Sequence, residues 1–326
     1  MLYLGIDLGG THIACGVVDR EGRIIAQAET PTLAERPFED VVRDMGACCL
    51  QALALAKCTA EDIATIGIGI PGIANNETGI VIFCTNLGWH DVPLVSELQK
   101  YINRPIYIEN DATVAGFAES VAGVSKGCKS SVFLTLGTGV GGGIIIDGKP
   151  WTGAHGVASE LGHLTLELDG IPCTCGKDGC LERYCSATAI IRMGKEACLS
   201  HPDCDIAQRV NGDISKITAK TVIDSARSGD DISMRIFHRY CRYLALAINT
   251  VVSFLDPEMV VLGGGVSHAG DFLLDAVRAK LPHYLMFKTM PYAEIHLAQL
   301  GNQAGIIGAA MLARIITEEG ETHHAY

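Results

Sequence analysis

The chain has 326 residues, of which 48% are hydrophobic, 19% charged and 6% aromatic, with 37 glycines and a formal net charge of −12. This composition is typical of a folded globular protein and excludes a disordered chain, and the length favours two domains over a single core. Net acidity without a dense Lys/Arg cluster argues against a nucleic-acid partner. No apolar run reaches the roughly 18 residues of a membrane span, so we expect no membrane partner.

The cysteines indicate the compartment. There are 13 of them, an odd number, and Met1 leads directly into an apolar run without a positively charged region before it. Both features argue against a secreted, disulfide-bonded protein. We therefore expect a cytoplasmic protein whose thiols stay free or bind metal.

The chain is predicted to open with a meander of strands over residues 2–8, 13–18 and 24–28. The first strand carries Asp7 and runs into Gly9-Gly10-Thr11. Two adjacent glycines let backbone N–H groups approach a phosphate closely, and Thr11 adds a hydroxyl. A tight hairpin without a ligand would explain this short motif equally well.

The next segments predict alternating helices and strands, with a candidate catalytic residue at one junction. Helices are expected over residues 38–57 and 95–102, and strands over 66–70, 81–83 and 106–108. Asn110 and Asp111 follow the last of these strands and precede a helix over 112–121. Ligands of open α/β sheets gather at such junctions. Asp111 can instead be the N-cap of that helix.

A second meander starts with a strand over residues 131–136 and turns at Gly137-Thr138-Gly139, repeating the chemistry of the first loop. We interpret this as an internal repeat, in which two Gly/Thr loops can clamp one polyphosphate; two unrelated hairpins are the alternative. A strand over 259–262 ends in Gly264 and Gly265, a third glycine junction that suits close approach of a nucleotide.

Residues 160–182 have the spacing of a zinc loop. Three cysteines and a nearby histidine make a closed tetrahedral set for a structural Zn²⁺, with no position left for an activated water; these are His163, Cys173, Cys175 and Cys180. Glycines between the ligands let the loop curl. A metal-free cysteine-rich loop is the alternative. Glu160 and Glu182 bracket the set and suit sugar hydroxyls, unless they are solvated surface carboxylates.

The remainder is mostly helical. Helices are expected over residues 187–198, 219–227, 234–255, 276–280 and 305–316, with a strand over 295–298. The polar tail over 318–326 is expected to be frayed.

Taken together, these motifs resemble the ROK family (repressors, open reading frames and kinases) of the actin, Hsp70 and hexokinase superfamily. The matching segments span nearly the whole chain: D-L-G-G-T at 7–11, N-L-G-W at 86–89, E-N-D-A at 109–112, L-G-T-G-V-G-G-G at 136–143, G-A-H-G-V-A-S-E-L-G-H at 153–163, C-T-C-G-K-D-G-C-L-E at 173–182 and L-G-G-G-V at 262–266. Within the family, the chain looks most like the bacterial glucokinases. It departs from the usual pattern at Ser159, where glycine is common, and at Ile73, where some members carry a polar residue.

The resemblance implies an α/β, two-domain actin-like ATPase (ribonuclease H-like) fold with an inter-domain cleft and a structural zinc loop. We expect a smaller domain of residues 1–118 plus 300–326 and a larger domain of residues 119–299. It also implies a homodimer or homotetramer.

The activity implied by the resemblance is transfer of a phosphoryl group from MgATP to the 6-hydroxyl of an aldohexose, glucose first. Asp111 would be the general base. The sugar would be bound by Asn86, Asn110, Asp111, Glu160, His163 and Glu182. The nucleotide and Mg²⁺ would be bound by Asp7, Gly9, Gly10, Thr11, Gly137, Thr138, Gly139, Gly264 and Gly265.

Three alternatives stay open from the sequence. The chain can be a kinase for another sugar, such as N-acetylmannosamine, N-acetylglucosamine, allose or fructose. It can be a sugar-sensing repressor, although only six residues precede Asp7 where repressors carry a DNA-binding module. It can also be a non-catalytic zinc protein, against which the presence of Asp111 and both phosphate loops argues.

Overall fold

The computed structural model describes residues 1–75 and 77–323. Its residues divide into two units, one of residues 1–127, 143–157 and the chain from 299 onward, the other of residues 128–142 and 158–298. The expected division into domains of residues 1–118 plus 300–326 and residues 119–299 stays a prediction. Within the described residues, no helix combines the length and the apolar character needed to cross a membrane.

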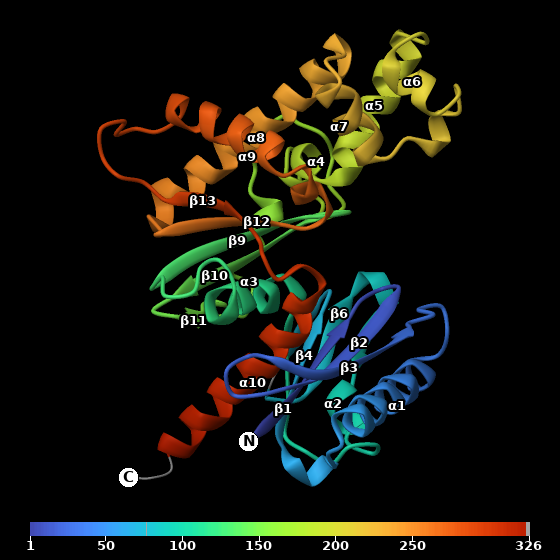
Figure 1. The fold of residues 1–326 in the computed structure, drawn as a ribbon, viewed down its shortest axis with the longest axis vertical. Coiled ribbons are helices and arrows are strands. Elements are labelled where there is room, and N and C mark those ends of the chain that lie inside the picture. The colour runs from blue at the N-terminus through green and yellow to red at the C-terminus, as the bar shows by residue number, and fades with distance from the viewer. Residues whose placement is uncertain (76, 324–326) are drawn as a thin grey trace. The chain divides into compact units, whose positions relative to one another are not determined.

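The first unit is built on a sheet with strand order β3-β2-β1-β4-β8 (Figure 1). The strands are β1 (Leu2–Leu8), β2 (His12–Val18), β3 (Ile24–Pro31), β4 (Ile63–Ile70) and β8 (Ile106–Asn110). β1 pairs antiparallel with β2 and parallel with β4, and β4 pairs parallel with β8. A smaller sheet of β5 (Ile73–Asn75), β6 (Ile80–Cys84) and β7 (Trp89–Val92) accompanies it.

Helices cover both faces of this sheet, because successive side chains of each strand point to opposite faces and both faces carry apolar side chains. The helices are α1 (Phe38–Ala56), α2 (Leu94–Leu98), α3 (Asp111–Ala122) and α10 (Ala304–His323). Leu4 and Ile6 of β1 join the core that contains the buried side of α1, whereas Tyr3 joins the core that contains α3 and α10. The last helix therefore packs on the first unit.

That last helix is longer than predicted. It continues past residue 316 to His323, so the expectation of a frayed tail over 318–326 is wrong as far as His323. Residues 324–326 lie outside the described part of the chain. Residues 317–319, T-E-E, contain no helix breaker, and the helix runs on through Gly320.

The second sheet repeats the order of the first, as β11-β10-β9-β12-β13. Its strands are β9 (Ser130–Leu136), β10 (Val140–Ile146), β11 (Lys149–Pro150), β12 (Met259–Gly263) and β13 (Glu294–Leu297). β12 pairs parallel with β9 and β13, and β10 pairs antiparallel with β11. Residues from Gly143 onward in β10, together with β11, belong to the first unit.

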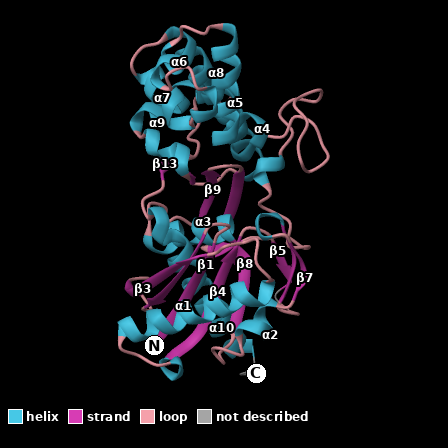
Figure 2. Cartoon of the chain, turned by 90° about the vertical axis from the view of Figure 1, so that its right-hand side faces the viewer, coloured by secondary structure: helices cyan, strands magenta, loops and turns pink. Residues whose placement is uncertain are grey.

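The helices of the second unit pack against one another in a single group (Figure 2). They are α4 (Glu182–Cys185), α5 (Ala187–Ser200), α6 (Asp205–Arg209), α7 (Ala219–Arg227), α8 (Asp231–Leu255) and α9 (Asp271–Lys280). The long α8 contacts α4, α5, α7 and α9. Its buried side chains, among them Phe237, Tyr240, Leu244 and Ile248, form the core of this group.

Glycines allow α10 to lie directly on the first sheet. A Cβ added at Gly67 would fall 1.9 Å from the Ala309 carbonyl oxygen, and one at Gly5 would fall 1.9 Å from the Ile306 carbonyl oxygen. Because both obstacles are backbone atoms, Gly67→Ala should force the helix from the sheet and destabilise the protein by about 3 kcal/mol or more. Gly137→Ala, where nothing lies within 4 Å, is the control. Equal urea midpoints for the two variants would contradict this packing.

Candidate functional site

The predicted site residues divide between the two units. Asp7, Gly9, Gly10, Thr11, Asn86, Asn110 and Asp111 belong to the first unit, and Gly137, Thr138, Gly139, Glu160, His163, Cys173, Cys175, Cys180, Glu182, Gly264 and Gly265 belong to the second. Each set is described within its own unit.

In the first unit, the Gly/Thr loop is a tight turn between β1 and β2. The Gly9 N–H donates to the His12 carbonyl at 2.9 Å, which closes the turn. Thr32, whose side chain the sequence did not single out, donates its hydroxyl to the Gly9 carbonyl at 2.7 Å. Asn86 lies beside the loop, since a Cβ on Gly10 would be 3.4 Å from its Cβ.

Asp7 is a half-buried carboxylate that carries an electrostatic cost. It lies in the centre of the sheet, opposite Ala14 of β2 and Gly69 of β4. Burial raises the pKa of Asp7 from its ordinary value of 3.8 to about 6, because removing water disfavours the ionised form. A cation held with phosphates would offset this cost. One carboxylate with phosphate and water oxygens is a donor set that Mg²⁺ accepts, so the residues fit that ion.

Asn110, and not Asp111, caps helix α3. The Asn110 side-chain oxygen accepts from the backbone N–H groups of Ala112 at 3.0 Å and Thr113 at 3.3 Å. The competing interpretation of Asp111 as the N-cap is therefore wrong. Asp111 occupies the first turn, where the helix dipole favours its ionised form.

In the second unit, the loop of residues 137–139 is held from several sides. The Gly137 N–H donates to the Gly139 carbonyl at 3.0 Å, as in the first loop, and the Gly137 carbonyl accepts from the Ala187 N–H at 2.8 Å. The Thr188 hydroxyl donates to the Thr138 carbonyl at 2.7 Å. Thr188, like Thr32, contacts a loop far away in sequence, so no local pattern could have revealed it.

Both loops leave backbone donors unused. Within residues 1–75 and 77–323, the N–H groups of Gly10, Thr11, Thr138 and Gly139 donate to no protein acceptor. Adjacent unused N–H groups in a turn form an anion-binding concavity. Each loop can therefore bind phosphate oxygens.

Gly264 is placed beside the second loop. It has φ 79°, and a Cβ there would lie 2.6–2.7 Å from backbone atoms of Leu136. Only glycine fits such a left-handed residue against another strand's backbone. The end of β12 thus approaches the strand that leads into the loop, so Gly264 lies near Gly137.

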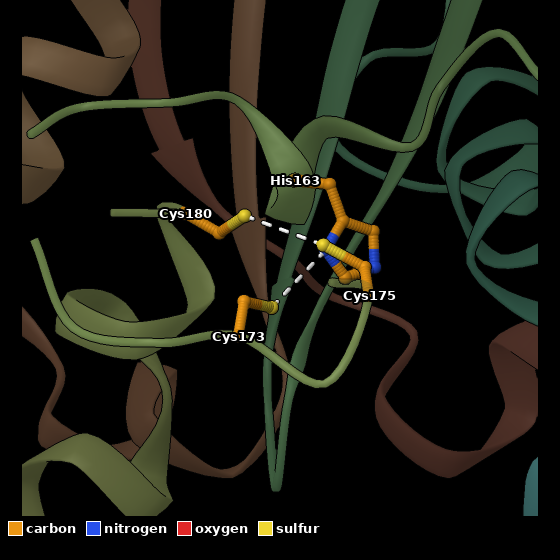
Figure 3. A group of neighbouring side chains, drawn as sticks. All are labelled: His163, Cys173, Cys175 and Cys180. Carbon is orange, nitrogen blue, oxygen red and sulfur yellow. Dashed lines mark hydrogen bonds between the residues drawn. The ribbon is translucent and has the colours of Figure 1, made fainter. Parts of the chain in front are cut away.

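The four predicted metal ligands come together in the second unit (Figure 3). One donor atom from each of His163, Cys173, Cys175 and Cys180 lies within 4.8 Å of the others. The Cys175 and Cys180 sulfurs are 3.6 Å apart, and the Cys173 sulfur is 3.7 Å from His163 Nδ1. Tetrahedral Zn²⁺ with bonds near 2.3 Å to sulfur places neighbouring sulfurs about 3.8 Å apart, so the cluster fits the ion.

The surroundings of the cluster also suit a cation. Burial and the neighbouring sulfurs raise the pKa of Cys180 to about 12, a cost that a divalent ion would offset by stabilising the thiolate. Gly179, with φ 71°, allows the loop to turn where a Cβ would meet the Glu167 carbonyl oxygen at 1.6 Å. The second nitrogen of His163, Nε2, lies 3.9 Å from a Glu160 carboxylate oxygen, which is too long for a direct hydrogen bond.

Glu182 connects the cysteine loop to the phosphate-type loop. It follows Cys180 by two residues, and its carboxylate accepts from the Val140 N–H at 3.0 Å. A Cβ on Gly139 would lie only 2.3 Å from the same carboxylate. Glu182 is therefore not simply a solvated surface carboxylate.

Ser159 occupies a backbone conformation that favours glycine. Its φ is 78°, in the left-handed region, where a side chain costs about 1–2 kcal/mol. The departure from the usual glycine at this position thus places strain next to Glu160.

The chain is similar to known proteins over nearly its whole length. Residues 3–315 match the ROK family. The glucokinase of Thermotoga maritima is 37% identical over 312 residues, covering 95% of this chain and 96% of that protein. A ROK family glucokinase from Streptomyces griseus, solved in complex with glucose and AMPPNP, has 35% identity and a TM-score of 0.82, covering 97% of this chain and 100% of that chain. The ROK hexokinase of Thermus thermophilus has 31% identity and a TM-score of 0.84, covering 98% and 100%.

These matches define the class of protein, an α/β protein with the actin-like ATPase fold, as predicted from the motifs. The chain belongs to the ROK family.

The metal cluster gives a direct prediction. Cys175→Ala removes one of the four donors, so the purified protein should lose the stoichiometric zinc found in the unaltered chain. Metal analysis by mass spectrometry measures this. Cys128→Ala removes a half-buried thiol outside the cluster and should retain zinc. Full zinc occupancy in Cys175→Ala would show that the cluster does not bind the ion.

Asp7 predicts a pH dependence of stability. The pKa of Asp7 in the folded chain, about 6, lies above the ordinary 3.8. The stability that this group gives the folded state is therefore fully present below about pH 4 and is lost as the pH rises through 6. Asp7→Asn cannot ionise, so the variant does not lose stability in this way. Its free energy of unfolding minus that of the parent should be larger at pH 8 than at pH 4 by roughly 1–3 kcal/mol. Urea unfolding in EDTA without nucleotide measures this, with exposed Asp203→Asn as control. A pH-independent difference would contradict the cost assigned to Asp7.

Proposed function

We propose that this chain phosphorylates the 6-hydroxyl of glucose with MgATP. The observation that carries the proposal is the 35–37% identity to glucokinases over nearly the whole of both chains. It covers the segments with the two Gly/Thr loops, the Asn-Asp junction and the cysteine loop, so the similarity is not confined to one motif.

In this proposal Asp111 is the general base. It accepts the proton of the sugar hydroxyl as the oxygen attacks the γ-phosphate in line. The support is local: Asn110 is the N-cap of the helix, so the cap does not depend on Asp111, whose Oδ1 accepts a hydrogen bond from the Ala112 N–H at 2.7 Å. The remaining contribution of the protein is positioning and electrostatic stabilisation, which dominate in phosphoryl transfer.

The two Gly/Thr loops bind the phosphates of ATP through their unused N–H groups. Gly9, Gly10 and Thr11 serve one loop, and Gly137, Thr138 and Gly139 the other. Mg²⁺ bound with the nucleotide would supply charge neutralisation on the phosphates, and Asp7 would orient it through water. Gly264 and Gly265 border the adenosine.

The sugar hydroxyls are bound by side chains that can accept hydrogen bonds from them or donate hydrogen bonds to them. They are Asn86, Asn110, Asp111, Glu160, His163 and Glu182. Because Nδ1 of His163 faces the cysteines while Nε2 faces Glu160, a structural zinc would fix the orientation of the ring. A side-chain acceptor that exchanges water for a sugar hydroxyl discriminates against sugars that lack this hydroxyl.

We further propose that the protein acts in the cytoplasm as a homodimer or homotetramer, as the family resemblance implies. The odd number of cysteines supports a reducing compartment. Light scattering of the purified chain distinguishes the two assemblies from a monomer.

Asp111→Asn tests the catalytic role. The variant should lower kcat by about 10²-fold or more with little change in glucose affinity, because the proton acceptor is lost while the hydrogen-bonding shape remains. Its free energy of unfolding should change by less than about 1 kcal/mol, since Asn110 still caps the helix. Exposed Asp203→Asn should leave kcat unchanged. A near-normal kcat in Asp111→Asn would remove Asp111 as the base.

The function itself is tested by ADP release with MgATP and a panel of glucose, mannose, N-acetylmannosamine, N-acetylglucosamine, allose and fructose. We expect kcat/KM for glucose to exceed the others by tenfold or more. A lead for another sugar would overturn the choice of glucose and keep the kinase. No turnover with any sugar, in a folded protein, would overturn the kinase.

A further inference from the structure

A row of basic side chains lies along one exposed face of α8. Arg235, His238, Arg239 and Arg242 are spaced by three and four residues, which places them on the same side of a helix, and each is exposed. Helical spacing disperses them among apolar residues, so the sequence shows no dense basic cluster. In the folded chain they form the basic row of the second unit.

The basic row lines a cavity of about 440 Å³. The other lining residues are Glu167, Tyr243, Leu246 and Tyr284. A second cavity of about 310 Å³ shares Arg235 and Arg239 with the first and adds His201. Volumes of this size are typical of small-molecule sites.

The arginines of the row lack carboxylate partners. Elsewhere in the chain arginines pair with acids, as Arg36 does with Asp44 at 2.7 Å. Among the described residues, none of Arg235, Arg239 and Arg242 forms an ion pair with a carboxylate. In a chain of net charge −12, adjacent unpaired guanidinium groups repel one another unless an anion joins them.

The acids at the two cavities are already engaged. The Tyr243 hydroxyl donates to Glu167 at 3.1 Å. Glu196, at the second cavity, lies 3.7 Å from Arg192 Nε. In the described part of the chain, neither carboxylate forms an ion pair with an arginine of the basic row.

Aromatic side chains hold the guanidinium groups in place. The Arg239 guanidinium carbon lies 5.9 Å from the centre of the Tyr243 ring, and that ring stacks on Tyr184 at 4.4 Å. Tyr284 lies close to Arg242 and raises the pKa of its guanidinium group. Such pre-ordering reduces the entropy that a ligand must otherwise overcome on binding.

We propose that the basic row and its cavity bind a phosphorylated small molecule. Guanidinium groups match phosphate oxygens in pairs, which makes arginine suited to this anion. The tyrosine rings and Leu246 offer an apolar wall for the part of the ligand that carries the phosphate. From Arg235 to Arg242 the row covers eight residues, about 10 Å of helix, which suits a metabolite and is too short for a polynucleotide track.

No residue of the basic row is among the proposed catalytic or metal-binding residues, although Glu167 at the cavity lies between His163 and Cys173 in sequence. Inorganic phosphate, pyrophosphate and a sugar phosphate share the chemistry that the row recognises. The inference therefore holds whichever sugar the protein phosphorylates.

Isothermal titration calorimetry of the full chain tests the proposal, with pyrophosphate and glucose 6-phosphate as probes at constant ionic strength. We expect binding that weakens at least tenfold in Arg239→Gln/Arg242→Gln. Arg23→Gln/Arg43→Gln is the matched control, because it removes the same charge from exposed, acid-paired arginines and should leave binding unchanged. Binding of the same probes at the Gly/Thr loops should persist in both double variants. The binding by the basic row is therefore the difference between the titrations of the parent and of Arg239→Gln/Arg242→Gln.

The outcomes separate clearly. Arginine-dependent binding of glucose 6-phosphate at least tenfold tighter than that of pyrophosphate identifies a sugar phosphate as the ligand class, and the reverse identifies an inorganic anion. Identical titrations of the parent and Arg239→Gln/Arg242→Gln with both probes would overturn the site. If circular dichroism shows that the double variant is unfolded, the single Arg235→Gln replaces it, with an expected weakening of at least fivefold; unchanged binding there also overturns the site.

Discussion

The hydrogen bond from the Val140 backbone N–H to the Glu182 carboxylate joins two parts of the second unit that carry different chemistry. One is the Gly/Thr loop at residues 137–139, and the other is the loop of cysteines and His163. Because Glu182 follows the buried ligand Cys180 by two residues, whatever orders the cysteines also orders this carboxylate. A structural metal in such a place acts on the phosphate-type loop without touching the substrate.

The junction at Asn110 and Asp111 shows a similar separation of structural and chemical roles. A helix that begins at the edge of a sheet needs acceptors for its first N–H groups. Asn110 supplies them with its side-chain oxygen, so the next residue can carry a carboxylate with another purpose. The position of Asp111 is thus set by the strand before it and the cap beside it.

Sequence reasoning succeeded where the signal is local. The cysteine spacing predicted the cluster, because ligands within one short loop cannot lie far apart, and the glycine junctions predicted tight turns at strand ends. It failed where a contact joins distant segments. Thr32 and Thr188 support loops that are far from them in sequence, and the partner of Glu182 lies 42 residues away. The left-handed φ of Ser159 was hidden because a serine carries no conformational signal of its own.

The two Gly/Thr hairpins are built by the same physical solution, which gives the internal repeat its meaning. In each, the first glycine N–H closes the turn, and a threonine hydroxyl from another segment donates to a loop carbonyl at 2.7 Å. Anchoring a turn through its carbonyls satisfies its acceptors and leaves its remaining N–H groups without protein partners. A buried or half-buried donor left in this way costs free energy unless a ligand oxygen takes the place of water. The sheets that present the hairpins also share one strand order. The same anchoring contact, a threonine hydroxyl donating to a loop carbonyl, occurs in both hairpins. The segments D-L-G-G-T and L-G-T-G can therefore differ in sequence and still provide the same backbone donors.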